Sequence, residues 1–297
     1  AEGPTSQQAP FYPFLLAGFY AVFGVGSAKA ILAVELLQCV AGAGLVLAVV
    51  WLAWSLMPDQ PAIGWIAGLG AAVYPTHLYM VTHLQVAVWA ALLLTVLLAV
   101  VVSPRWRATR GGAILAGVLA GVLLLVEPIL ALALPVAAVA FWTAEPRRFA
   151  AAAWGRLGMM AVVAAAIITP WTVRNALVHG EFVFIKSTFG YAFWQGNTPG
   201  SWGTDKVPKP SAEILRNDHD GTLADINRAL WESRHETLYI DDVLLHDDDY
   251  RVLGRLAEPE RSRLLGRRAW ESVVDEPGRY ASLCLQRLGY FLAFDPT

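Results

Sequence analysis

Charged residues are scarce in this chain. Asp, Glu, Lys and Arg make up 15% of its 297 residues, whereas a soluble domain carries about 25%. Hydrophobic residues make up 56%, and the mean hydropathy is +0.48. Most of the charge lies after Trp171, and the stretch 11–172 is mainly Ala, Leu, Val, Gly and aromatic residues. A segment this apolar requires lipid as its solvent, which predicts an all-α polytopic membrane protein.

Other absences exclude several classes of function. The net charge is −2 and no basic stripe occurs, so we expect no nucleic-acid partner. The sequence contains no Walker loop and no dinucleotide-binding fingerprint. The two cysteines, Cys39 and Cys284, have no metal-ligand spacing and are not expected to form a disulfide. We expect both to be buried as small hydrophobic residues.

The sequence also contains no complete metal-binding loop. Asp241, Asp242 and the acidic run 247–249, together with His246, form the densest group of candidate ligands. A divalent cation is one interpretation, and a solvated acidic face with helix N-caps is the other. We therefore expect no cofactor, with a divalent metal as the open alternative.

Long apolar runs predict the membrane spans, because about 20 apolar residues cross a hydrocarbon core. The run 62–102 would be about 60 Å long as one helix, so it must fold back, and its polar residues place the turn at 79–84. The run 111–143 is interrupted by Glu127-Pro128, where we expect a second hairpin. The predicted spans are 28–57, 62–80, 84–103, 111–126, 128–143 and 157–172.

Two clusters of arginine orient these spans. Short loops that are rich in Lys and Arg face the cytoplasm. The turns at 79–84 and 127, and everything after Trp171, then lie on the outer side of the membrane. The clusters are Arg105, Arg107 and Arg110, and Arg147, Arg148 and Arg156.

The remaining segments are predicted to lie outside the bundle. Residues 1–27 are expected to form an outer juxtamembrane helix, since aromatic residues gather at 10–24; a short tilted span is the alternative. Residues 173–286 are expected to form a periplasmic region of loops and helices. Within it we expect a short strand at 182–185, a turn-rich stretch at 190–203, and helices at 222–239, at 247–256 and from 261 onward, the last one broken at Pro277-Gly278.

The two ends of the chain predict a fragment of a longer protein. The chain begins at Ala1 rather than Met, and 287–297 is expected to start a further span.

Arg174 is the first candidate site residue. It follows the last predicted span in the run Pro170-Trp171-Thr172-Val173-Arg174-Asn175, and Lys186 follows twelve residues later. A guanidinium at headgroup level can bind phosphate oxygens bidentately, and Lys adds a point charge. Arg174 and Lys186 are therefore candidate ligands of a lipid phosphate. A snorkelling anchor is the alternative.

Polar residues at the predicted outer turns are further candidates. His77, His83, Gln85 and Glu127 lie at the ends of otherwise apolar runs. Such residues are costly in lipid and tend to face a cavity. The alternative is that hairpin turns are polar where water begins.

The segment 187–200 mixes aromatic residues, amides and glycines. Aromatic rings pack on sugar rings, and amides bind sugar hydroxyls. Trp194 and Asn197 are therefore candidates for a substrate cavity, and an interfacial aromatic belt is the alternative.

Three of these runs carry a family resemblance. Residues 170–175, 180–185 (Gly-Glu-Phe-Val-Phe-Ile) and 196–200 (Gly-Asn-Thr-Pro-Gly) resemble the motifs PW-T-[IV]-RN, G-x-[FL]-V-x-I and G-N-x-P-G, in this order. They are similar to those of bacterial glycosyltransferases of the GT-C class, family 39-like, which are related to protein O-mannosyltransferases and lipid A aminoarabinose transferases. Weaker likeness covers 9–24 and 268–291.

The resemblance implies an enzyme of the bacterial inner membrane with a GT-C-like helix bundle. Such an enzyme transfers a sugar from a polyprenyl-phosphate donor to a lipid, protein or glycan acceptor on the periplasmic face. The family's catalytic carboxylate lies in the first outer loop, ahead of Ala1, so no catalytic base is assigned and the fragment is expected to be inactive. Arg174 matches the family's motif arginine. The expected substrate-cavity residues are His83, Gln85, Glu127, Asn175, Trp194 and Asn197.

Two positions depart from the family pattern, which often has Glu where Gln85 stands and Arg where Glu127 stands. The competing classes are a non-enzymatic multi-pass transporter and an inactive scaffold of the same fold. A transporter would show broken spans in repeated halves with charges at the midplane. Here most polar groups gather at the predicted outer rim instead.

Overall fold

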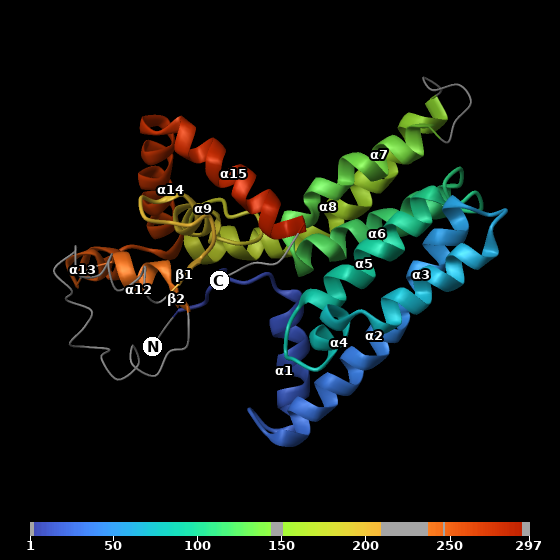
Figure 1. The fold of residues 1–297 in the computed structure, drawn as a ribbon, viewed down its shortest axis with the longest axis horizontal. Coiled ribbons are helices and arrows are strands. Elements are labelled where there is room, and N and C mark those ends of the chain that lie inside the picture. Colours follow the sequence, from blue (N-terminus) through green and yellow to red (C-terminus); the bar gives the residue numbers. More distant parts are fainter. Residues whose placement is uncertain (1–2, 144–150, 209–236, 246, 293–297) are drawn as a thin grey trace. The chain divides into compact units, whose positions relative to one another are not determined.

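The computed structural model describes residues 3–143, 151–208, 237–245 and 247–292. The chain divides into two compact units, each of which is described by itself (Figure 1). The bundle unit comprises Gln8–Ile185, and the polar unit comprises Ala1–Gln7 with Lys186–Thr297. Both are mainly helical, as the sequence predicts, and the two strands of the described residues have three residues each.

Helices make up the bundle unit. Its first half contains α1 (Phe11–Phe23), α2 (Ala28–Leu56), α3 (Pro61–Val73) and α4 (Pro75–Val81). Its second half contains α5 (Ala87–Val102), α6 (Arg110–Val126), the 3-10 helix η1 (Pro128–Ala133), α7 (Leu134–Thr143) and α8 (Ala151–His179).

Local signals set where these helices begin. The hydroxyl of Ser27 accepts a hydrogen bond from the Ala30 N–H at 3.1 Å, and that of Thr109 accepts one from the Gly112 N–H at 2.9 Å. These side chains satisfy N–H groups that the first turns of α2 and α6 leave unpaired. Proline begins α3, α4 and η1, where its missing N–H costs nothing.

The core of the bundle unit lies among α5, α6, α7 and α8. Leu97, Leu123 and Phe141 are fully buried there. Gly117 and Gly121 lie one turn apart on α6 and face α8, where an added Cβ would approach Met160 O to 2.7 Å and Ile167 Cβ to 2.9 Å. This G-x-x-x-G spacing lets two helices approach closely, which is a common contact between helices in membranes.

Two helices of the described residues, α2 and α8, are long and apolar enough to cross a membrane. Each has 29 residues, and their most apolar windows have mean hydropathies of 2.2 and 1.7. Only 33% and 28% of these windows are buried, so most of their residues are half-buried or exposed. The other apolar helices have 10–17 residues and are therefore short for a core of about 30 Å. Helix length alone thus establishes fewer spans than the six expected.

The polar unit contains α9 (Phe189–Asn197), α12 (Ile240–Leu244), α13 (Asp247–Arg255), α14 (Glu258–Asp275) and α15 (Pro277–Leu292). Its strands β1 (Lys206–Pro208) and β2 (Thr237–Tyr239) pair antiparallel, with Val207 opposite Leu238. Ile240, Leu265 and Ala269 form part of its buried core. Between α9 and α14 the backbones nearly touch, because an added Cβ at Gly190 would lie 2.0 Å from Ser262 O.

Four expectations about helices and strands are wrong. The helix expected at 222–239 is described only at 237–239, and these residues form the strand β2. The last span was expected to end at 172, but α8 continues through Pro170 to His179. A proline removes one helical hydrogen bond, and apolar helices often tolerate that loss. The segment 182–185 is extended but pairs with no strand among the described residues. The stretch expected to be turn-rich begins instead with α9.

Other expected boundaries shift or fall outside the described residues. The expected span 62–80 is two helices, α3 and α4, separated at Tyr74-Pro75, and the expected span 128–143 begins as a 3-10 helix. Cys39 and Cys284 are exposed rather than buried. Arg147, Arg148, His246, residues 222–236 of one expected helix and residues 293–297 of the last expected span lie outside the described residues.

Candidate functional site

The motif residues at the end of α8 hold the segment 182–185 in place. The Trp171 indole N–H donates to Ile185 O at 3.0 Å, and the Thr172 hydroxyl donates to Phe184 O at 2.8 Å. The Asn175 amide donates to Val183 O at 3.3 Å and to Ile185 O at 3.1 Å. Side chains one helical turn apart thus take the place of a partner strand. The run 170–175 and the segment 182–185 are therefore held together by hydrogen bonds from side chains to the backbone.

Arg174 lies within this arrangement. Its guanidinium carbon is 4.6 Å from the centre of the Trp171 ring, and its Nη1 donates to Asn175 Oδ1 at 3.0 Å. Arg174 is half-buried and Asn175 is fully buried. Stacking on an indole and a hydrogen bond to an amide both restrict the rotamers of a long side chain. The guanidinium is therefore preorganised at the last turns of a long apolar helix.

Lys186, the second predicted cation, belongs to the polar unit and is half-buried. Next to it, the Ser187 hydroxyl donates to the Glu258 carboxylate, which also accepts from the Ser6 N–H at 2.8 Å and from the Thr5 hydroxyl at 2.6 Å. Glu258 lies in the first turn of α14, where a negative charge is favourable. It therefore joins the first residues of the polar unit to the segment after Lys186.

Two of the polar residues at the predicted outer turns, His77 and His83, contact backbone carbonyl groups. His77 is buried, and its Nδ1 is 2.8 Å from Ala71 O. That carbonyl lacks its usual donor four residues later, because residue 75 is proline. His83 is exposed and stacks on Tyr79. Gln85 and Glu127 are half-buried, and Glu127 caps the C-terminal end of α6.

Gln38 is a buried polar residue that sequence reasoning missed. It is 0% exposed on α2, where it accepts a hydrogen bond from the Tyr12 hydroxyl at 2.8 Å. Its amide donates to His83 O at 2.7 Å and to Val81 O at 3.3 Å. Burial, with smaller contributions from Tyr20 and Glu35, raises the pKa of Tyr12 to about 12. A single glutamine inside an apolar run was the signal that could have identified this residue.

Two arginines of α15 hold the loop 196–203 of the polar unit. Arg279 donates to Asn197 O at 3.1 Å, to Thr198 O at 2.7 Å and to Ser201 O at 3.2 Å. Arg287 donates to Gly203 O at 2.7 Å, to Asn197 Oδ1 at 2.9 Å and to Gly196 O. The two arginines are eight residues apart, which places them on one face of the helix. That spacing was the signal in the sequence that could have paired them.

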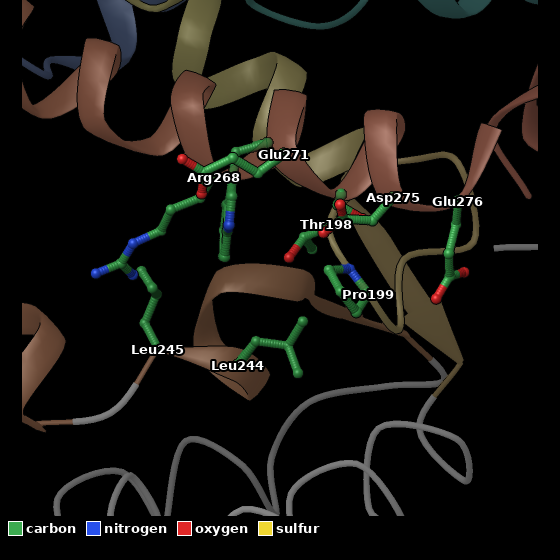
Figure 2. A pocket seen from close by; sticks show the side chains of 10 residues that line it. Thr198, Pro199, Leu244, Leu245, Arg268, Glu271, Asp275 and Glu276 are labelled. Carbon is green, nitrogen blue, oxygen red and sulfur yellow. The ribbon is translucent and has the colours of Figure 1, made fainter.

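A pocket of about 430 Å³ lies beside this loop in the polar unit (Figure 2). Trp194, one of the predicted cavity residues, is buried and lines it. Asn197, another predicted cavity residue, is buried but does not line the pocket. Its side-chain oxygen accepts a hydrogen bond from Arg287 Nη2, and its side-chain amide donates one to Phe193 O. The pocket is lined by Trp194, Thr198, Pro199, Leu244, Leu245, Arg268, Glu271, Ser272, Asp275 and Glu276.

The predicted acidic group is described only in part, because His246 and the side chains of Asp242 and Asp247 lie outside the description, so only Asp241, Asp248 and Asp249 can be placed in the described part of the chain. No group of three or more His, Cys, Asp or Glu side chains suited to a metal occurs there. The Asp241 carboxylate accepts instead from the Tyr191 hydroxyl at 2.9 Å and from the Gln195 amide at 3.3 Å. Asp249 pairs with Arg268 at 2.9 Å.

The predicted site residues thus belong to two units. Arg174, Asn175, His83, Gln85 and Glu127 lie in the bundle unit, and Lys186, Trp194 and Asn197 lie in the polar unit. No known protein family, curated protein or solved structure matches the chain.

Proposed function

We propose that this chain is part of a GT-C-class membrane glycosyltransferase that uses a polyprenyl-phosphate-linked sugar donor. The observation that carries the proposal is the preorganised guanidinium of Arg174 at the end of the long apolar helix α8. Arg174 stacks on Trp171 and donates a hydrogen bond to Asn175, and all three residues belong to the run 170–175. Side chains of the same run also donate hydrogen bonds to the carbonyl groups of 183–185. This local arrangement accounts for two of the three motifs that resemble the family.

Uncovered apolar surface supports the placement in a membrane. On α2 the exposed residues Leu32, Leu36 and Val40 recur at every fourth position, and each has at least half of its surface exposed. Such spacing forms a continuous stripe along one face of a helix. Soluble proteins rarely leave an apolar surface of this extent in water. We therefore propose a multi-pass protein of the bacterial inner membrane, with residues 173–286 on the periplasmic side.

Charge at the membrane boundary supports the choice of ligand. A phosphate bound by a guanidinium forms charge-assisted hydrogen bonds, which are roughly twice as strong as neutral ones. A guanidinium held in one orientation loses little conformational entropy when the phosphate binds. A neutral lipid or a transported cation would gain nothing from Arg174. The same reasoning disfavours the competing proposal that the chain transports cations.

The proposal is tested by binding of a polyprenyl phosphate to the purified chain in lipid nanodiscs. We expect Arg174→Gln to weaken binding by roughly 10- to 100-fold, which corresponds to the loss of a hydrogen bond to a charged group, about 1.5–3 kcal/mol. Arg107→Gln is the matched control, because Arg107 is exposed in the loop between α5 and α6. The neutral polyprenol should bind weakly to all three proteins.

Two results would contradict the proposal. Equal affinity of the Arg174→Gln variant and the unaltered chain for polyprenyl phosphate would remove the phosphate contact and leave Arg174 as a membrane anchor. Equal binding of the phosphate and the alcohol would show that the chain recognises only the prenyl tail.

A further inference from the structure

The pocket of the polar unit has walls of two kinds. Pro199, Leu244 and Leu245 form an apolar wall, and the facing surface of α14 carries Glu271 and Asp275. Figure 2 shows Thr198 and Pro199 between α14 and the Leu244–Leu245 segment. At about 430 Å³ the pocket has the size of ordinary small-molecule sites. A ligand that fits must therefore have an apolar body and a polar end.

The polar wall has an excess of negative charge. Three carboxylates line the pocket, those of Glu271, Asp275 and Glu276, and within the described residues none of them forms a hydrogen bond or an ion pair. Among the described residues that line the pocket, the one cation is Arg268, which is bound to Asp249 at 2.9 Å. An anionic ligand would be repelled here. A metal ion does not fit either, because these carboxylates do not form a metal-binding group.

Thr198 provides an independent indication of a ligand. Only 7% of its surface is exposed, and Figure 2 shows its side chain directed into the pocket. Its backbone carbonyl is bound by Arg279 and by the Ser201 N–H, but its hydroxyl has no hydrogen-bond partner among the described residues. The hydroxyl is not one of the fully buried unpaired side-chain atoms of the described residues, so it opens into the pocket. A ligand group inside the pocket would satisfy it.

We propose that this pocket binds a small organic ammonium ion that also carries a hydroxyl group. The ammonium lies at the carboxylates of Glu271, Asp275 and Glu276, where charge-assisted hydrogen bonds form. The hydroxyl pairs with Thr198, and the carbon skeleton packs on Pro199 and the two leucines. The indole of Trp194 adds an aromatic surface of the kind that attracts cations. This site is separate from the lipid-phosphate proposal and does not depend on it.

The test measures binding of three small probes to the purified chain in an uncharged detergent by ligand-observed NMR. The probes are trans-4-aminocyclohexanol, cyclohexylammonium and 1,4-cyclohexanediol, which share a ring and differ in their polar groups. We expect the aminoalcohol to bind most tightly, with a Kd in the millimolar range, and the diol to bind weakest. High salt should weaken both amines, because the carboxylates are exposed.

Variants assign each contact. Glu271→Gln combined with Asp275→Asn should weaken both amines by about fivefold to tenfold, since exposed charge pairs contribute little individually. Thr198→Val, which keeps the shape of the side chain, should weaken only the aminoalcohol, by about fivefold. Glu260→Gln is the matched control, because Glu260 lies on the same helix, is exposed and does not line the pocket.

Three outcomes would overturn the proposal. Equal binding of the diol and the aminoalcohol would exclude recognition of the charge. A double carboxylate variant that binds the amines as well as the unaltered chain and the Glu260→Gln variant do would place binding elsewhere. A Thr198→Val variant that weakens both amines equally would remove the hydroxyl from the proposed ligand. Circular dichroism of each variant is the control for retention of the helical fold.

Discussion

Replacing Asn175 by alanine is expected to release the segment 182–185 from the end of α8. The change removes two donated hydrogen bonds, to Val183 O and Ile185 O. Ile185 O keeps the hydrogen bond from Trp171, so losing the bond from Asn175 costs about 1 kcal/mol there. Val183 O loses the hydrogen bond from Asn175, and a buried carbonyl left unpaired costs about 1–3 kcal/mol. Together the local stability should fall by about 2–4 kcal/mol. This corresponds to a roughly 30- to 1,000-fold larger population of the open segment.

Trypsin can report this opening, because Lys186 follows the segment directly. When opening and closing are fast relative to cleavage, the cleavage rate follows the population of the open form. We expect cleavage after Lys186 to accelerate at least tenfold in the Asn175→Ala variant. The full thousandfold is an upper limit, since the contacts of Ser187 with Glu258 and Ser6 remain. Cleavage after Arg107, in an exposed loop, is the internal reference.

Two further variants sharpen the test. Asn175→Asp keeps the size of the side chain but replaces both amide donors by acceptors, so it should accelerate cleavage at least as much as alanine. Thr172→Val removes one bond to an exposed carbonyl and should have an effect of twofold or less. A cleavage rate within twofold of the unaltered chain for both Asn175 variants would refute the role assigned to these hydrogen bonds.

The remaining predictions concern a glycine contact and a titration. Gly190→Ala should prevent α9 from packing on α14, because its Cβ would lie 2.0 Å from the backbone oxygen of Ser262; a thermal unfolding midpoint equal to that of the unaltered chain would contradict this. Gly254→Ala, where an added Cβ meets nothing within 4 Å, should instead stabilise α13 by about 0.5–1 kcal/mol. Burial raises the pKa of Tyr12 from its ordinary value of 10.0 to about 12, so the folded state holds this proton more tightly than the unfolded chain. The contribution of Tyr12 to stability is therefore present below pH 10 and lost between about pH 10 and 12. Replacing Tyr12 by Phe should remove one late-titrating tyrosine from the titration curve measured by near-ultraviolet absorbance. An unchanged titration curve would contradict the burial of this hydroxyl.

Proline and the hydrophobic pattern predict much of the helical layout. The first long run was expected at 28–57, and α2 occupies Ala28–Leu56, because Ser27 caps it and Met57-Pro58 stops it. Glu127-Pro128 ends α6, and Pro277 begins α15 after the single residue that follows the end of α14 at Asp275. At each of these places the local signal and the packing agree.

Pro170 misled the same reasoning. A proline ends a helix when its lost hydrogen bond is not compensated, and the sequence does not show compensation. Here the residues after Pro170 stay helical while Trp171, Thr172 and Asn175 bind the extended segment. The tertiary contacts therefore decide the outcome. Tertiary contacts also decide the conformation of 182–185. Its residues have high β propensity, which predicts a strand but does not reveal that side chains of α8 bind its carbonyl groups.

The contacts of the predicted site residues could not be predicted from residue type. Asn175 and Asn197 were expected to face a substrate, yet both amides bind groups of their own unit. An isolated amide in a sequence indicates a buried polar contact without saying whether the partner is a ligand or a carbonyl. Thr198 and Glu271 carry no motif signal for the pocket, because they meet only through the packing of α9 against α14.

Arg279 and Arg287 connect α15 rigidly to the loop 196–203. Six hydrogen bonds from two guanidinium groups reach the loop, and Thr198 and Pro199 of that loop border the pocket. Any rotation or sliding of α15 must drag this border with it. Occupancy of the pocket and the position of the C-terminal helix would then be thermodynamically coupled, each altering the other by the same free energy.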